Sequence, residues 1–297
     1  MEYTLFSFRN AQVIFENDDR YTQHWHEMLS ALDSINDSDI IEKYNANPRA
    51  SQKSISDAIN ILIDERLVEM GWDRQSPIFN DSEYRPNSQG HWGTLDFVKG
   101  EISVEVAFNH GEATAWNLVK PVLAGELNHV EKAVQTSAGI IITATDSMKH
   151  FGNLDGAAGS YEKFLQYLKP FNNILTIPMM IIGLKAPSTF FVNPVSKQVT
   201  DISEHIFPQI WVGTEICRIL DAREISYRKT TSITRNGNRI AMYIKATRPK
   251  IAVLNSTPEA GVSTLLENEG WKVICLDQIH SELDLKTMCE DLRDYET

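Results

Sequence analysis

The sequence predicts an α/β protein with a mixed central sheet flanked by helices, followed by a smaller C-terminal α/β domain. Two features lead to this expectation. From residue 95 to residue 184 the apolar pattern runs hairpin, helix, strand, helix, strand, an alternation that favours a sheet with helices on both faces. After Pro187 a second series of helix, hairpin, strand, helix and strand begins. We therefore expect a core domain over residues 1–195 and an accessory domain over residues 196–297.

The composition is that of an ordinary globular protein. The 297 residues are 42% hydrophobic and 23% charged, which excludes collagen, coiled coils and extended disorder. The three cysteines lie far apart and form no CxxC pair, so we expect reduced thiols rather than a zinc module. The N-terminus has no signal-peptide pattern, and no apolar run reaches the length of a membrane span. We expect a cytoplasmic protein that does not associate with membranes.

The opening sixty residues are predicted to be helical. Residues 21–32 and 54–70 place large apolar side chains at helical spacing, and the second helix stops at Gly71. The polar stretch 34–51 is expected to be a loop or a short helix. Residues 73–92 are rich in Asn, Ser, Pro and Gly without an apolar period, which predicts a long connection of the kind that often carries function.

A β-hairpin is predicted next. Residues 95–98 and 102–108 flank the turn Lys99-Gly100-Glu101, which suits a hairpin. The apolar pattern then predicts, in order, a helix over 115–133, a buried strand over 139–145, a helix over 161–168 and a buried strand over 177–184.

The accessory domain contains a concentrated positive charge. Its predicted elements are a helix over 211–220, a hairpin over 225–243, strands over 251–254 and 273–276, and helices over 261–270 and 284–295. The whole chain has a formal net charge of -12, which argues against bulk attraction to nucleic acid. Residues 225–258, however, contain seven Lys or Arg and no Asp or Glu. Such a stripe is suited to binding phosphates locally.

Two carboxylates on the predicted hairpin are the clearest candidates for chemistry. Asp96 and Glu105 lie nine residues apart across the tight turn, so the hairpin can bring them to the same end of a sheet. Like charges in such proximity are unfavourable unless a cation lies between them, and Mg²⁺ prefers carboxylate ligands together with water and phosphate oxygens. The pair therefore predicts half of a metal site for phosphodiester cleavage. The alternative is that both are solvated strand residues.

A family resemblance favours the metal site. The chain contains SISDAINILIDERLVEMGW, then LDFVKGEISVEVAF, then YEKFLQYLKPFNNILTIPMMIIGLKAP. The middle run resembles the core of the PD-(D/E)xK nucleases, and the three blocks in order resemble the BglII/BstYI-type type II restriction endonucleases over roughly residues 1 to 190. This resemblance implies a homodimer that cleaves double-stranded DNA at a short palindromic site with Mg²⁺.

The resemblance also assigns roles within the hairpin. It implies that Asp96, Glu105 and the backbone carbonyl of Ala107 bind Mg²⁺. The chain departs from the family at Ala107, where relatives have Gln, or Lys in the wider superfamily. This departure matters because the methyl group of alanine cannot orient or deprotonate the attacking water. Asn109 would lie on the same face as Glu105 if the strand continues, and His110 could accept a proton if the strand breaks there.

Other side chains remain candidates for supporting the site. An ordinary surface or helix residue is the alternative for each, and the sequence singles out none of them: Glu112, Lys120 and Lys132 after the hairpin, and Asp57, Asp64 and Glu65 on the preceding helix.

Two segments are candidates for contacting DNA. Arg, Asn and Gln can read base edges in the major groove, and the loop before the hairpin offers such side chains. In the accessory domain the tip of the basic hairpin offers a second set. The predicted contacts are Arg85, Asn87, Gln89 and His91 in the loop, and Arg235, Asn236, Asn238 and Arg239 at the tip. A polar connection and a solvated hairpin are the alternatives.

Two other functions remain open. A non-catalytic DNA-binding or regulatory protein that retains the nuclease fold is favoured by Ala107. An α/β metabolic enzyme unrelated to nucleic acid is favoured by the acidic charge.

Overall fold

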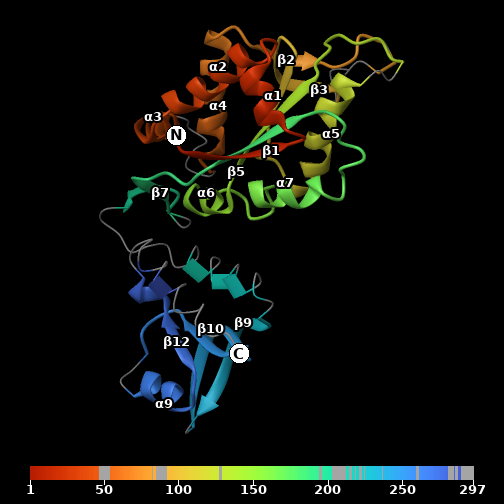
Figure 1. The fold of residues 1–297 in the computed structure, drawn as a ribbon. Helices are drawn as coiled ribbons and strands as arrows, with labels where there is room; N and C mark the ends of the chain where they lie inside the picture. Colours follow the sequence, from red (N-terminus) through yellow and green to blue (C-terminus); the bar gives the residue numbers. More distant parts are fainter. Residues whose placement is uncertain are drawn as a thin grey trace. The chain divides into compact units, whose positions relative to one another are not determined.

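The chain divides into two compact units, Met1–Thr200 and Asp201–Thr297 (Figure 1). This division falls slightly after the expected boundary between residues 195 and 196. The structure is a computed structural model, and it describes residues 1–46, 54–81, 83–84, 92–126, 129–193, 196–202, 212–213, 216–217, 219–220, 223, 225–235, 237–258, 261–279, 284 and 287–288.

The large unit is built on a six-stranded mixed sheet. In spatial order its strands are β1 (Tyr3–Phe8), β6 (Met179–Leu184), β5 (Ala138–Ala144), β4 (Ile102–Val106), β3 (Thr94–Lys99) and β2 (Asp73–Pro77). The central strand β5 is parallel to both β4 and β6, whereas the outer pairs are antiparallel. The predicted α/β class, hairpin and two buried strands are confirmed. A separate two-stranded sheet joins β7 (Phe190–Val192) to β8 (Val199–Asp201).

Helices cover both faces of this sheet, as Figure 1 shows. One face packs against α1 (Ala11–Asn17), α2 (Thr22–Ser34), α3 (Asp37–Ala46), α4 (Ser56–Glu69) and α6 (Asp146–Phe151). The other face packs against α5 (Thr114–Gly125) and α7 (Tyr161–Leu168). Strand alternation divides the side chains between them: Ile140 and Ile142 belong to the first core, and Ile141 belongs to the second.

Three elements differ from the sequence-based expectation. Tyr3–Phe8 is a strand rather than a helix, because it pairs along its whole length with β6. Asp73–Pro77 is a strand within the expected connection, because it pairs with β3. The helix expected over 115–133 ends at Gly125, where an added Cβ would lie 3.0 Å from Ile177. These elements depend on distant partners.

The small unit contains a four-stranded sheet. Its order is β12 (Lys272–Cys275), β11 (Lys250–Leu254), β10 (Asn238–Thr247) and β9 (Tyr227–Arg235), with α9 (Val262–Asn268) connecting β11 to the parallel β12. The predicted basic hairpin is β9 with β10. The expected helix over 284–295 lies largely outside the described residues, as does part of the helix over 211–220. Among the residues that can be placed, no helix is long and apolar enough to cross a membrane.

Candidate functional site

Asp96 and Glu105 lie side by side on the face of the sheet that α5 covers. Phe97 of β3 pairs with Val104 of β4, so the antiparallel register places Asp96 opposite Glu105 at the next step. Phe97 and Val104 both belong to the core beneath α1–α4. Because side chains alternate along a strand, the two carboxylates share the opposite face.

Asp96 is tied to β4 by a backbone hydrogen bond. Its Oδ2 accepts a hydrogen bond from the Val106 amide at 2.8 Å, and its Oδ1 accepts one from Gln75 Nε2 at 3.5 Å. The first bond fixes the Asp96 side chain beside the residue that follows Glu105. The longer second bond leaves Oδ1 only weakly held.

Glu105 is buried with part of its carboxylate unsatisfied. The residue is 1% exposed, and its Oε1 has no hydrogen-bond partner among the described residues. Burial, together with the negative charge of Asp96, raises the pKa of Glu105 to about 8, although Lys120 acts in the opposite direction. A buried carboxylate oxygen without a partner is costly, so this site favours a cation.

Lys120 reaches this carboxylate from α5. Its Nζ forms an ion pair with Glu105 Oε2 and donates a hydrogen bond to the Thr94 carbonyl at 3.1 Å. The helix approaches the sheet closely because β5 has Gly139 there: an added Cβ at Gly139 would lie 2.9 Å from Pro121 Cβ. Close packing of α5 on β5 therefore sets the position from which Lys120 reaches Glu105.

The backbone at Ala107 faces β5 rather than Asp96. Its carbonyl accepts a hydrogen bond from the Thr143 hydroxyl at 2.9 Å, and its amide donates to the Ile142 carbonyl at 2.8 Å. The Val106 amide points the other way, toward Asp96. Because the amide and carbonyl of one strand residue share an edge, the Val106 carbonyl faces the β3 side.

Comparison with known proteins gives the family of this segment. A model of the family described as restriction endonuclease BglII/BglIII matches residues 3–184. The chain belongs to this family. The match spans every strand of the six-stranded sheet, so both carboxylates and Lys120 lie within it. Membership in the BglII/BglIII family supports a type II DNA-cleaving enzyme.

Solved structures of BglII resemble the chain. Restriction endonuclease BglII complexed with a DNA 16-mer is 20% identical, with a TM-score of 0.45, and the similarity covers 68% of this chain and 88% of that one. Free BglII is 17% identical, with a TM-score of 0.41, over 83% of this chain and 93% of that one. No curated protein matches the chain.

The other residues predicted after the hairpin are not joined to this carboxylate pair. Asn109 and His110 are exposed, and no hydrogen bond or ion pair in the described part of the chain links either side chain to Asp96 or Glu105. The Asn109 carbonyl accepts from the Gly159 amide at 2.9 Å, and His110 forms an isolated bridge with Ala158. Both roles remain predictions.

The remaining candidates have other partners. Lys132 donates to the Leu123 carbonyl, and its Nζ lies 5.2 Å from the ring centroid of Phe79. On α4, Asp64 pairs with Arg74 at 3.1 Å and Glu65 pairs with Lys43 at 2.6 Å. Among Lys120, Lys132, Asp64 and Glu65, the structure places Lys120 against the pair.

The predicted DNA contacts are only partly described. Arg85, Asn87, Gln89, His91 and Asn236 lie outside the described residues. At the hairpin tip, Arg235 Nε contacts both Glu269 oxygens at 2.7 and 2.9 Å. Arg239 is exposed, with its Nε 3.0 Å from Ser232 Oγ, and the backbone of Asn238 pairs with that of Arg235. Arg239 is thus a predicted contact whose side chain faces solvent.

The residues present fit a hard divalent cation. Within the described residues, no group of three or more His, Cys, Asp or Glu side chains forms a metal cluster. Mg²⁺ is usually bound by one or two protein carboxylates, and water and phosphate oxygens complete its coordination shell. The unpartnered Glu105 Oε1 and the weakly held Asp96 Oδ1 are oxygens of that kind.

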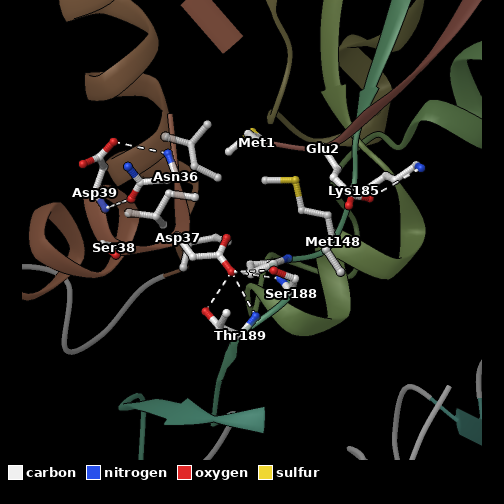
Figure 2. A pocket seen from close by; sticks show the side chains of 15 residues that line it. Met1, Glu2, Asn36, Asp37, Ser38, Asp39, Met148, Lys185, Ser188 and Thr189 are labelled. Carbon is white, nitrogen blue, oxygen red and sulfur yellow. Dashed lines mark hydrogen bonds and ion pairs between the residues drawn. The ribbon is translucent and has the colours of Figure 1, made fainter. Parts of the chain in front are cut away.

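A cavity of about 600 Å³ lies away from this carboxylate pair, beside α3 (Figure 2). Figure 2 shows the Asp37 carboxylate pointing at Ser188 and Thr189. Its Oδ2 accepts hydrogen bonds from both amides and both hydroxyls at 2.8–3.1 Å. These bonds secure the segment after β6 to α3. Neither Asp96 nor Glu105 lines this cavity.

Proposed function

We propose that this chain is a type II restriction endonuclease that hydrolyses phosphodiester bonds of double-stranded DNA with Mg²⁺. The observation that supports this most strongly is the placement of Asp96 opposite Glu105 on one face of the sheet, inside the segment matched by the family model. The related BglII structure is a complex with a DNA 16-mer, which supports duplex DNA as the ligand.

The proposed metal ligands are the carboxylates of Asp96 and Glu105 and one backbone carbonyl. The Ala107 carbonyl accepts a hydrogen bond from the Thr143 hydroxyl on the β5 side. The Val106 carbonyl is the better placed third ligand, because the Val106 backbone faces Asp96. When bound, Mg²⁺ supplies a more acidic water and offsets negative charge on the scissile phosphate. Asp96 and Glu105 hold their oxygens in place for this through the Val106 amide and the Lys120 ammonium.

The proposed active form is a homodimer that recognises a short palindrome. A two-fold symmetric dimer presents two copies of the carboxylate pair, one to each strand of a symmetric duplex site. Charge supports a local contact with DNA: the acidic chain has its acid-free basic segment at residues 225–258. The exposed Arg239 lies in that segment.

The test is cleavage of plasmid DNA. The purified protein with Mg²⁺ should give discrete fragments. Asp96→Asn and Glu105→Gln should each abolish them, although each keeps the shape of the original side chain. Glu101→Gln is the matched control, because Glu101 is a carboxylate at the turn of the same hairpin. Cutting by both Asp96→Asn and Glu105→Gln at the rate of the unaltered protein contradicts the proposal.

A second candidate function is supported by Ala107, which is 2% exposed and cannot supply the family's side chain at that position. It is a DNA-binding protein that retains the fold without cleaving. Salt-sensitive duplex binding without cutting in Mg²⁺ or Mn²⁺, on methylated and unmethylated DNA, would favour this function.

A further inference from the structure

We propose that Lys120 supplies, from α5, the polar side chain that Ala107 cannot provide from the strand, and that its ammonium holds the attacking water or the scissile phosphate. This inference rests on the proposed nuclease function. It makes Lys120 a catalytic residue, which the sequence alone does not distinguish from other candidates because Lys120 comes from a different element than the two carboxylates.

Ala107 and Lys120 come to the same face of the sheet from two different elements. Side-chain alternation places Ala107 on the face that carries Glu105. Its methyl group packs in one cluster with Leu118 and Val122 of α5. Lys120 lies two residues from each of these, so it projects from a different side of the helix, and its Nζ contacts Glu105. The ammonium at the carboxylate pair therefore comes from the helix, while the strand supplies only a methyl group at position 107.

The Lys120 ammonium is held in a fixed place and keeps donor capacity. Lys120 is 7% exposed, and a lysine is rarely buried so deeply without a partner. Within the described ranges its polar contacts are the Glu105 carboxylate and the Thr94 carbonyl. An ammonium carries three N–H donors, so these two contacts leave one for a further oxygen. A water or phosphate oxygen bound at Glu105 would lie within reach of it.

The packing of α5 on the sheet fixes the position of the Lys120 ammonium. The Gly139–Pro121 approach holds α5 directly against β5, one residue from Lys120. A pre-positioned positive charge in a dry site stabilises charge that develops on a phosphate far better than water does. In the hydrolysis, a bond forms from the water oxygen to phosphorus as the bond from phosphorus to the leaving oxygen breaks. The water proton passes through solvent to the leaving oxygen, and Lys120 keeps its own protons.

Lys99 offers a matched comparison within the same hairpin. Its Nζ also contacts one carboxylate and one backbone carbonyl, those of Glu27 at 2.7 Å and Met70 at 2.6 Å. Lys99 has the same strand parity as Phe97, so its partners lie on the opposite face from Asp96 and Glu105. Replacing Lys99 therefore removes a similar pair of contacts without touching the proposed site.

The experiment uses Lys120→Met, the same variant with Ala107→Lys added, and Lys99→Met as control. Single-turnover cleavage, Mn²⁺ affinity by calorimetry without DNA, and the melting temperature are measured for each. We expect Lys120→Met to slow cleavage by about 100-fold or more, the size of effect that one positioned donor gives. Its Mn²⁺ affinity should be equal or tighter, because a positive charge beside Glu105 has been removed.

The added Ala107→Lys should restore cleavage by about tenfold or more, since it returns the charge from the strand. Lys99→Met should cut at the rate of the unaltered protein. If Lys120→Met does not fold, Lys120→Leu, which fills the same space, takes its place with the same expected loss.

Three outcomes overturn the assignment. Lys120→Met cutting at the unaltered rate removes any role for the ammonium. Weaker Mn²⁺ binding by Lys120→Met, or no recovery with Ala107→Lys, shows that Lys120 only positions Glu105. Failure of the unaltered protein to cut DNA in Mg²⁺ or Mn²⁺ overturns the proposed function itself, and the assignment of Lys120 falls with it.

Discussion

The carboxylate of Asp96 accepts a hydrogen bond from the amide of Val106 at 2.8 Å, which ties a side chain of β3 to the backbone of β4. The bond passes directly beside Glu105. It both stabilises the hairpin and fixes one of the two proposed metal ligands, and these two roles can be separated by substitution.

Asp96→Asn and Asp96→Ala should differ in stability but not in activity. Asparagine keeps an oxygen that can accept from the Val106 amide, so we expect its free energy of unfolding to stay within about 0.5 kcal/mol of the unaltered protein. Alanine leaves that amide unpaired and should cost about 1 kcal/mol or more. Urea denaturation measures both, and both variants should lose Mg²⁺-dependent cleavage. Equal stability of the two variants would contradict the role of the Val106 bond.

The buried Glu105 predicts a pH dependence of stability in the metal-free protein. Its pKa is raised from 4.5 to about 8, chiefly by burial, so the folded state holds the proton more tightly than the unfolded state. The free energy of unfolding should therefore fall as pH rises through that interval, by at most about 1.4 kcal/mol per pH unit for this one group.

Glu105→Gln removes this titration. In EDTA, the free energy of unfolding of the variant, relative to that of the unaltered protein, should increase steadily as pH rises from the pKa of Glu105 in the unfolded state, 4.5, toward its pKa in the folded state, about 8. Urea denaturation across this interval measures the difference. A difference that stays constant with pH contradicts a raised pKa at Glu105.

The contact between Gly139 and Pro121 predicts a specific sensitivity. An added Cβ at Gly139 would lie 2.9 Å from Pro121 Cβ and 3.1 Å from Met179 Cγ, so Gly139→Ala must displace α5. We expect a loss of about 1–3 kcal/mol, typical of overpacking, together with slower cleavage because Lys120 moves with the helix. Gly156→Ala is the control, since no atom lies within 4 Å of its added Cβ. Similar melting temperatures for the two variants would contradict this account.

The basic hairpin predicts a change in salt dependence. Arg239 is exposed, so Arg239→Ala should weaken DNA binding and lower the slope of log affinity against log salt by about 1, as expected for one lost phosphate contact. Arg20→Ala is the control, because Arg20 is an exposed arginine of the large unit that pairs with Asp18 at 2.7 Å. An unchanged slope in Arg239→Ala excludes that phosphate contact.

The shared face of Asp96 and Glu105 was predictable from the sequence because it follows from local geometry. A short turn fixes the register of two strands, and a period of two then decides which side chains face together. The buried strands at 138–144 and 179–184 were predictable for a similar reason, since each is a continuous apolar run.

The elements that sequence reasoning missed depend on distant partners. Tyr3–Phe8 becomes a strand through β6, near the other end of the large unit. The polar segment Asp73–Pro77 becomes a strand through β3. Lys120 was one of several possible supports; it lies on α5 and contacts Glu105, whereas Lys132 lies beyond the end of this helix and contacts the Leu123 carbonyl. The spacing of apolar residues within one helix does not predict how closely that helix packs on a sheet.

A crystal soaked in Mn²⁺ tests the central claim most directly. The anomalous map should contain one peak on the α5 face of the sheet, about 2 Å from an oxygen of Asp96 and from an oxygen of Glu105, the distance expected for a hard divalent cation. A peak bound to one of these carboxylates alone, or no peak between them, would contradict the account.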